Sequence, residues 1–199
     1  MIKIKDVFKL PVVLSISLLL MLAETTGSLF SKSLSLLSYA GLILAVSSSA
    51  LPLIAGQNIN IQDAEGFKRS QFYSISINCI MLFIISIYII YKAAALISNP
   101  RGINLALTCW TALSAFTGLI PCLILLYSQA KKNKVIKGLF IKYFLCALLA
   151  PIIIVSSAVY YLKDMYFMDP LVSIFITALI IVQIFFLAKQ ALVSLIISE

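Results

Sequence analysis

The sequence SLSLLSYAGLILAVSSS, from Ser33 to Ser49, is an apolar stretch with the pattern of a helix. It contains no Asp, Glu, Lys, Arg or His, and the whole chain contains no His. Ionisable residues inside a membrane usually mark the path of an ion or a proton, because burying them in hydrocarbon is costly and only function retains them. That marker is absent from this stretch.

The rest of the chain is also strongly apolar. Hydrophobic residues make up 62% of the 199 residues and charged residues only 11%, and the mean hydropathy is +1.11. A chain of this composition does not stay in solution as a globule, so we predict an integral membrane protein. The net charge of +8 then indicates the lipid bilayer as partner, and not nucleic acid, because the basic residues cluster at the ends of apolar runs.

Six segments are each long enough to cross the hydrocarbon as a helix, which takes roughly 20 mostly apolar residues. They lie at about 10–30, 34–56, 71–96, 104–128, 138–162 and 170–193. We therefore predict an all-α, six-helix transmembrane bundle that forms a single domain over residues 1–199. The first apolar stretch also has features of a secretory signal, but its end, LAETTGS, is a poor cleavage site, and we expect it to be retained.

The distribution of lysine and arginine predicts the orientation in the membrane. Cytoplasmic loops carry an excess of these residues. The N-terminal segment, the second and fourth loops and the tail share one side and hold most of them, so we expect both termini in the cytoplasm. That side has Lys3, Lys5, Lys9, Lys68, Arg69, Lys131, Lys132, Lys134, Lys137 and Lys189, and the opposite side has Lys32, Lys92, Arg101 and Lys163.

Three collinear segments carry a resemblance to a known family. Ala23–Leu37 reads AETTGSLFSKSLSLL, Gly66–Gln71 reads GFKRSQ, as a loop before a helix that ends in Asn-Pro, and Met168–Leu192 opens with Met-Asp-Pro. They are similar, in this order, to the first hairpin, the G-Y-x-R-x-E loop and the Asp-Pro start of the sixth helix in cation diffusion facilitators, also called the cation efflux family.

The resemblance implies a transmembrane bundle of the cation diffusion facilitator type. Members of the family export zinc and related divalent cations in exchange for protons, usually as homodimers with a cytoplasmic C-terminal domain. The sequence ends at Glu199, so we expect no such domain here. We expect a homodimer or a heterodimer with a related transporter and no cofactor. We expect no enzymatic activity either, because the chain has neither a nucleophile paired with a base nor a phosphate-binding loop.

The family's transport site combines a His or Asp with an Asp at the i+4 position in both the second and the fifth helix. Nitrogen and carboxylate ligands suit borderline cations such as zinc. By the resemblance, these positions fall on Leu42, Val46, Lys142 and Cys146. Only Cys146 could act as a ligand, and one thiol does not make a tetrahedral site. We therefore predict that no intact metal site remains at these positions.

Two further positions depart from the family pattern. Gln71 replaces the carboxylate of the loop, and Tyr39 replaces an Asp that often precedes the pair in the second helix. Two functions stay open. In one, the chain is a non-transporting or regulatory partner of a ligand-bearing relative. In the other, it is a transporter with altered chemistry, in which Cys146, serine hydroxyls and backbone carbonyls bind a different solute.

Three charged residues are the remaining candidates for function. Glu24 either pairs with Lys32 across the first hairpin or relays protons. Lys142 either extends its long stem to the cytoplasmic head groups or holds its ammonium in the vacated cation site. Asp169 lies directly before Pro170, which favours a cap on the sixth helix, because Asp is a preferred N-cap residue.

Aromatic side chains cluster near the fifth loop. Tyr160, Tyr161, Tyr166 and Phe167 lie where the fifth span ends and the sixth begins. Tyrosine is enriched where a membrane protein meets the head groups. We therefore predict an aromatic belt at this interface.

Overall fold

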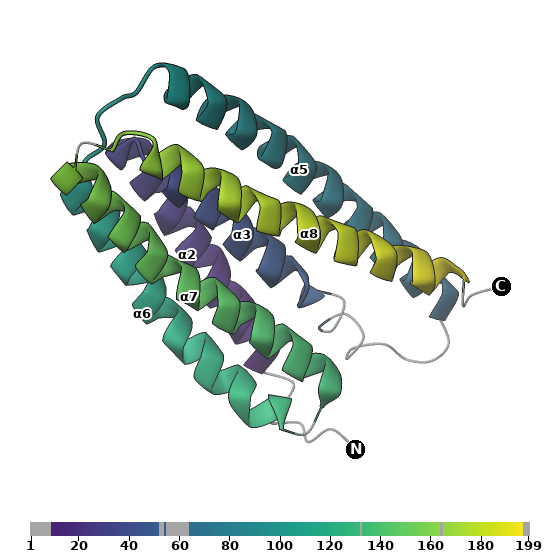
Figure 1. Cartoon of the computed structure of the whole chain (residues 1–199). Coiled ribbons are helices and arrows are strands. Elements are labelled where there is room, and N and C mark those ends of the chain that lie inside the picture. The colour runs from purple at the N-terminus through teal and green to yellow at the C-terminus, as the bar shows by residue number, and fades with distance from the viewer. Residues whose placement is uncertain (1–8, 52–53, 55–63, 132, 164, 197–199) are drawn as a thin grey trace.

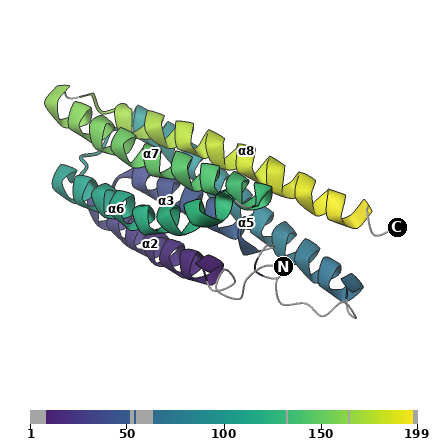
Figure 2. The same cartoon turned by 90° about the horizontal axis from the view of Figure 1, so that it is seen from below.

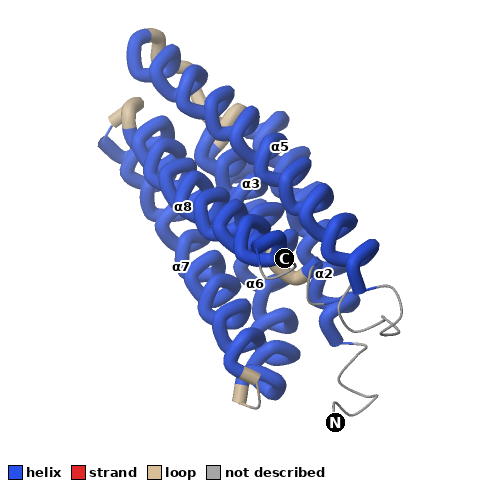
Figure 3. Tube along the Cα trace, turned by 90° about the vertical axis from the view of Figure 1, so that its right-hand side faces the viewer, coloured by secondary structure: helices blue, strands red, loops and turns tan. Residues whose placement is uncertain are grey.

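The computed structural model describes residues 9–51, 54, 64–131, 133–163 and 165–196. These residues form α-helices that run along a common direction, with no strand among them (Figure 1, Figure 3). The helices are α2 (Lys9–Ser31), α3 (Leu34–Ser48), α5 (Ala64–Ser98), α6 (Leu105–Ala130), α7 (Lys134–Lys163) and α8 (Met168–Ile196). The all-α bundle predicted from the sequence is confirmed.

The outer surface of the bundle is apolar, as expected of a protein surrounded by lipid. Five of the six helices hold a stretch long and apolar enough to cross a membrane, and α3 is the shorter one, at 15 residues. Large apolar side chains such as Ile84, Trp110 and Phe185 are exposed on the outside. In water such a surface would drive aggregation, whereas in lipid it is the preferred one.

The second helix is shorter than the sequence predicted. The expected span reached residue 56, but α3 ends at Ser48, and the N–H of Ser49 bonds to the carbonyl of Val46 at 3.2 Å. Such a bond to the third residue back tightens and closes a last helical turn. Pro52 follows in the sequence. Proline has no N–H and cannot donate to the carbonyl of the fourth residue before it, which is Ser48, the last residue of α3.

The segment Gly66–Gln71 is helical, so its prediction as a loop is wrong. Helix α5 begins at Ala64 and continues to Ser98, over 35 residues. At 1.5 Å per residue this helix is about 52 Å long, which exceeds the hydrocarbon thickness of about 30 Å. Charged residues in its first turns are therefore compatible with a helix that extends beyond the hydrocarbon.

Helix α3 lies at the centre of the bundle. It packs against α2, α5, α7 and α8, and all of its residues are buried except Leu37 and Leu44, which are half-buried. Gly41 allows α8 to approach closely, because a Cβ atom there would lie 3.2 Å from Cδ1 of Ile180. Helix α6 does not belong to this group and packs against α7 and α2, and α5 packs mainly against α8 (Figure 2).

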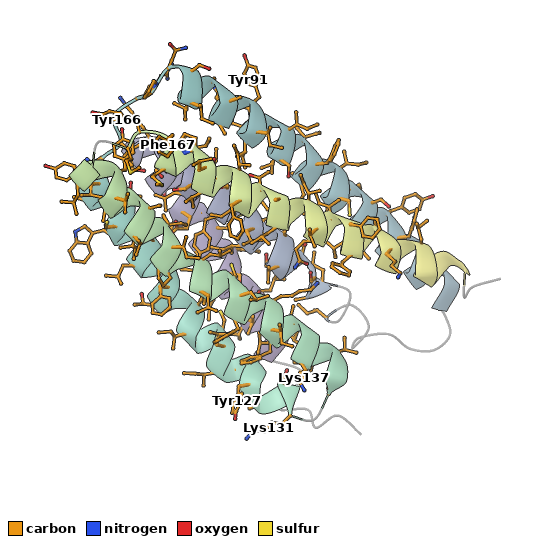
Figure 4. The ribbon with its side chains drawn as sticks, viewed as in Figure 1. Tyr91, Tyr127, Lys131, Lys137, Tyr166 and Phe167 are labelled. Carbon is orange, nitrogen blue, oxygen red and sulfur yellow. The ribbon has the colours of Figure 1, made fainter. Side chains whose placement is uncertain are left out.

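The two ends of the bundle differ in their side chains. Tyr91, Tyr166 and Phe167 lie at the end where α3 and α8 begin, and Lys131 and Lys137 lie at the opposite end (Figure 4).

The predicted aromatic belt is only partly correct. Tyr161, Tyr166 and Phe167 are exposed, but Tyr160 is buried. Its hydroxyl donates to the carbonyl of Arg101 at 2.7 Å. A buried phenol needs a hydrogen-bond partner. This one links α7 to the connection between α5 and α6.

Candidate functional site

The positions implied by the family resemblance lie between α3 and α7, and most of them are apolar core. Leu42 and Val46 of α3 and Cys146 of α7 are buried and belong to one cluster of packed side chains. Lys142 is half-buried, and its ammonium donates to the hydroxyl of Ser49 at 3.3 Å. Ser49 caps the C-terminal end of α3, where the helix dipole favours a positive charge.

A tyrosine connects the two helices in the middle of the bundle. The hydroxyl of Tyr39, on α3, donates to the carbonyl of Cys146, on α7, at 3.1 Å. The same hydroxyl also lies within hydrogen-bonding reach of the Cys146 thiol. Tyr39 is fully buried, so this polar contact fixes the relative position of α3 and α7 in an otherwise apolar interface.

A second buried hydroxyl pair links α2 to α7. Ser17 and Tyr143 share a hydrogen bond of 2.8 Å, and the Ser17 hydroxyl also lies 2.8 Å from the carbonyl of Val13. Both side chains are buried. The sequence alone did not indicate this pair. Polar side chains within apolar spans usually pair across helices, but the sequence does not show which of them meet.

Glu24 is a buried carboxylate without a hydrogen-bond partner in the described part of the chain. Its side chain on α2 is 0% exposed, and neither of its oxygens has a partner among those residues. It lies close enough to the Tyr39 hydroxyl and the Cys146 thiol to interact electrostatically with both. The three groups come from α2, α3 and α7, and in the described part of the chain no hydrogen bond joins Glu24 to the other two.

The predicted pair of Glu24 with Lys32 is wrong. Lys32 is exposed and occupies the turn between α2 and α3 with a φ angle of 60°. Its side chain belongs to the surface, whereas the Glu24 carboxylate faces the centre of the bundle. Glu24 lies seven positions before Ser31, the last residue of α2, which is about two helical turns.

Asp169 stabilises the start of α3 rather than the start of its own helix. Its carboxylate accepts hydrogen bonds from the N–H of Leu34 at 2.8 Å and the N–H of Ser35 at 3.2 Å. It also accepts from the hydroxyls of Ser33 at 2.7 Å and Ser35 at 2.6 Å. The prediction that Asp169 caps the sixth helix is therefore wrong, because the helix that it caps is α3.

The position of Asp169 explains this difference. Helix α8 begins at Met168, so Asp169 already lies in its first turn, and its side chain is free to reach a neighbouring helix. Helices α3 and α8 begin at the same end of the bundle and pack against each other (Figure 1). One carboxylate thus faces the positive ends of two helix dipoles.

The remaining predicted residues contribute no metal ligand in the described structure. The hydroxyls of Ser47, Ser48 and Ser49 donate to carbonyls of their own helix, those of Leu44 and Ala45.

The side chain of Gln71 lies outside the described side chains, although its backbone is part of α5. Among the described residues, no three Cys, Asp or Glu side chains come together in a way that could hold a metal ion.

Known proteins are similar to this chain over the helices described above. The sequence model of the family described as "Cation efflux transmembrane domain" matches residues 10–196. The chain is also 36% identical, over 85 residues, to a protein of Bacillus subtilis (strain 168) named "Cadmium, cobalt and zinc/H(+)-K(+) antiporter". That match covers 40% of this chain and 27% of the Bacillus protein, so the chain spans only part of the length of that relative.

We predict that Asp169→Asn lowers the stability of the bundle. The amide presents a donor to N–H and O–H groups that already donate, so buried donors at the start of α3 lose their acceptor, at a cost of about 1–3 kcal/mol. The midpoint of thermal unfolding in detergent, followed by size-exclusion chromatography, measures this loss. Asn104→Ala is the control, because Asn104 caps α6 at an exposed position and should cost about 1 kcal/mol or less. If Asp169→Asn lowered the unfolding midpoint no more than Asn104→Ala does, this would contradict the assignment of Asp169 as the cap of α3.

Proposed function

The chain belongs to the cation efflux family, and on that premise we propose that it is a non-transporting or regulatory partner subunit in divalent-cation homeostasis. It is a multi-pass integral membrane protein, with five helices long and apolar enough to span a membrane and a shorter α3 between them. The proposal is that it keeps the helix bundle of the family but has lost the ion chemistry between α3 and α7.

The observation that carries this proposal is the apolar packing at the family's ligand positions. Leu42 and Val46 are buried in the same cluster as Cys146. A divalent cation placed between them would lose its hydration without gaining carboxylate or imidazole ligands, and the cost of burying an uncompensated charge is far larger than any packing gain.

Lys142 adds to this barrier. Its ammonium lies at the C-terminal end of α3, on the hydroxyl of Ser49. A fixed positive charge on the approach to the helix pair repels a divalent cation. A subunit with this arrangement contributes helix-packing surface to a dimer but no ligands for transport.

We predict no zinc uptake by the purified full chain in proteoliposomes. Uptake should equal that of empty liposomes, whereas a ligand-bearing relative reconstituted in parallel should accumulate zinc and change the internal pH. Zinc-sensitive and pH-sensitive dyes inside the vesicles measure both. Zinc uptake by this chain above the empty-liposome level would overturn the proposal.

The regulatory part of the proposal is tested in the native membrane. A tagged copy of the chain, extracted in mild detergent, should bring down a related protein that carries the His and Asp ligands. Recovery of self-associated chain alone would count against a partner role.

The orientation is a further part of the proposal. The end of the bundle that holds Lys131 and Lys137 (Figure 4) is assigned to the cytoplasm, because positive residues accumulate on that side. A fluorescent reporter that matures only in the cytoplasm should be bright when fused after Glu199. A dark fusion, with a bright one in the loop between α5 and α6, would reverse the assignment.

A transporter with altered chemistry is the second candidate. The contact between Tyr39 and Cys146 favours it, because a hydroxyl and a thiol-bearing residue are hydrogen-bonded to each other in the apolar core. In this case Cys146→Ala should reduce metal accumulation and metal tolerance in cells that depend on the protein, whereas Cys79→Ala on α5 should not. Unchanged accumulation and tolerance in Cys146→Ala would exclude this candidate.

A further inference from the structure

The connection between α6 and α7 carries positive charge that no carboxylate of the same segment balances. Lys131 is the C-cap residue of α6, and α7 begins at Lys134 and has Lys137 as its fourth residue. The sequence contains no Asp or Glu between Glu65 and Asp164. Lys131 and Lys137 are exposed, and neither forms an ion pair with another residue of the described structure. Both ammonium groups are therefore available to an anion.

The direction of α7 adds to this imbalance of charge. The start of a helix carries the positive end of its dipole, which favours an anion and disfavours a lysine. Helix α7 nevertheless begins with lysines and has no acidic residue in its first turn. An anion bound at this end therefore neutralises the lysines and also meets the positive end of the dipole.

The same two helices present a row of aromatic rings next to the lysines. The ammonium of Lys131 lies over the ring of Tyr127, 4.7 Å from its centre. The ring centre of Tyr127 lies 5.9 Å from that of Phe140, and Phe140 stacks on Phe144 with 6.3 Å between the ring centres. Tyr127 and Phe144 are exposed, and Phe140 is half-buried. These three residues, the aromatic row, thus form part of the outer surface of the bundle.

The lysines and the aromatic row follow one another along the helices. Tyr127 and Lys131 are four residues apart on α6, and Lys137, Phe140 and Phe144 are spaced by three and then four residues on α7. Such spacings place side chains on the same face of a helix. Tyr127, Lys131 and Lys137 lie at one end of the bundle (Figure 4). From Lys137 to Phe144 the helix advances about 10 Å, so the charged end leads into an apolar surface.

This combination matches a lipid better than a soluble anion. A lysine ammonium has three N–H donors, and the contact with the Tyr127 ring occupies only one side of the Lys131 ammonium. The remaining donors can bind the oxygens of a phosphate group. A soluble anion needs the lysines alone, whereas a phospholipid also covers the exposed aromatic row with an acyl chain.

We propose that this end of the α6–α7 pair binds an anionic phospholipid, with Lys131 and Lys137 on the phosphate of the headgroup and an acyl chain along the aromatic row. Clusters of lysines directly next to a membrane helix attract anionic lipids. Lys132 and Lys134 add two charges to the same part of the sequence. The bound lipid contacts both helices and so stabilises their packing at this end.

The lipid site is separate from the interface between α3 and α7. Lys142, the next lysine along α7, takes no part in it, because its ammonium donates to the hydroxyl of Ser49 at the end of α3. Lipid binding goes beyond the proposed function and does not depend on it, since a subunit that transports and one that does not both lie in a bilayer.

The test is a titration of the purified full chain, in a non-ionic detergent, with phosphatidylglycerol and with phosphatidylcholine of the same acyl chains. Phosphatidylglycerol should raise the midpoint of thermal unfolding to a saturating value, and native mass spectrometry should detect it on the protein. Phosphatidylcholine should do neither. Lys131→Gln/Lys137→Gln should weaken the binding of phosphatidylglycerol about 30-fold, because each lysine next to an anionic lipid surface contributes about a fivefold factor in affinity.

Two double variants are the controls. Lys92→Gln/Arg101→Gln removes the same amount of charge near the end of α5, where Lys92 makes a comparable contact with the ring of Tyr88 at 5.6 Å, and it should bind phosphatidylglycerol as the wild type does. Lys131→Arg/Lys137→Arg keeps the charge and should retain the binding that the glutamine pair loses. Size-exclusion chromatography confirms that each variant is folded, as expected for changes at exposed or half-buried lysines.

Four outcomes overturn the inference. The first is an equal effect, or no effect, of both lipids. The second is unchanged binding in Lys131→Gln/Lys137→Gln, and the third is an equal loss in Lys92→Gln/Arg101→Gln, which would indicate a response to net charge alone. The fourth is a thermal shift of the same size with inorganic phosphate or glycerol phosphate, which would identify a soluble anion as the occupant. Zinc uptake by the wild-type chain overturns the proposed function and leaves the lipid site in place, so the two failures are distinguishable.

Discussion

The hydrogen bonds that Asp169 accepts at the start of α3 hold the central helix of this bundle in place. Helix α3 is enclosed by four other helices, so its first N–H groups have no access to water and must find partners inside the protein. The carboxylate is 2% exposed and satisfies two of these groups together with the Ser33 and Ser35 hydroxyls. Because Asp169 belongs to α8, the same contacts fix α3 relative to α8.

The position of α3 decides which residues can meet across the core. With its start fixed by Asp169, Tyr39 reaches Cys146 on α7, and Leu42 and Val46 pack in the same cluster. In this geometry α3 and α7 face each other, and most of the residues packed between them are apolar. A charged residue type also lies buried in the bundle, because Glu24 of α2 is 0% exposed.

The sequence predicted the fold class well and the local details less well. Apolar segments of about 20 residues fix the number and the type of the helices, but their ends depend on neighbours. Helix α3 ends at Ser48 and not near residue 56, and α5 extends through Gly66–Gln71, where the family resemblance had indicated a loop. Tyr160 was expected at the interface and is buried, because the carbonyl of Arg101 lies within its reach.

By itself, the sequence determined that the chain is embedded in a membrane and that it is helical. Each of these follows from composition or from the identity of single residues. Only the tertiary structure decided the partners of the polar groups. Asp169 and Ser33 are 136 residues apart, and Tyr39 and Cys146 are 107 apart. Such contacts depend on how each helix is rotated and positioned in the bundle, and in spans that are apolar on every side the local pattern does not encode that rotation.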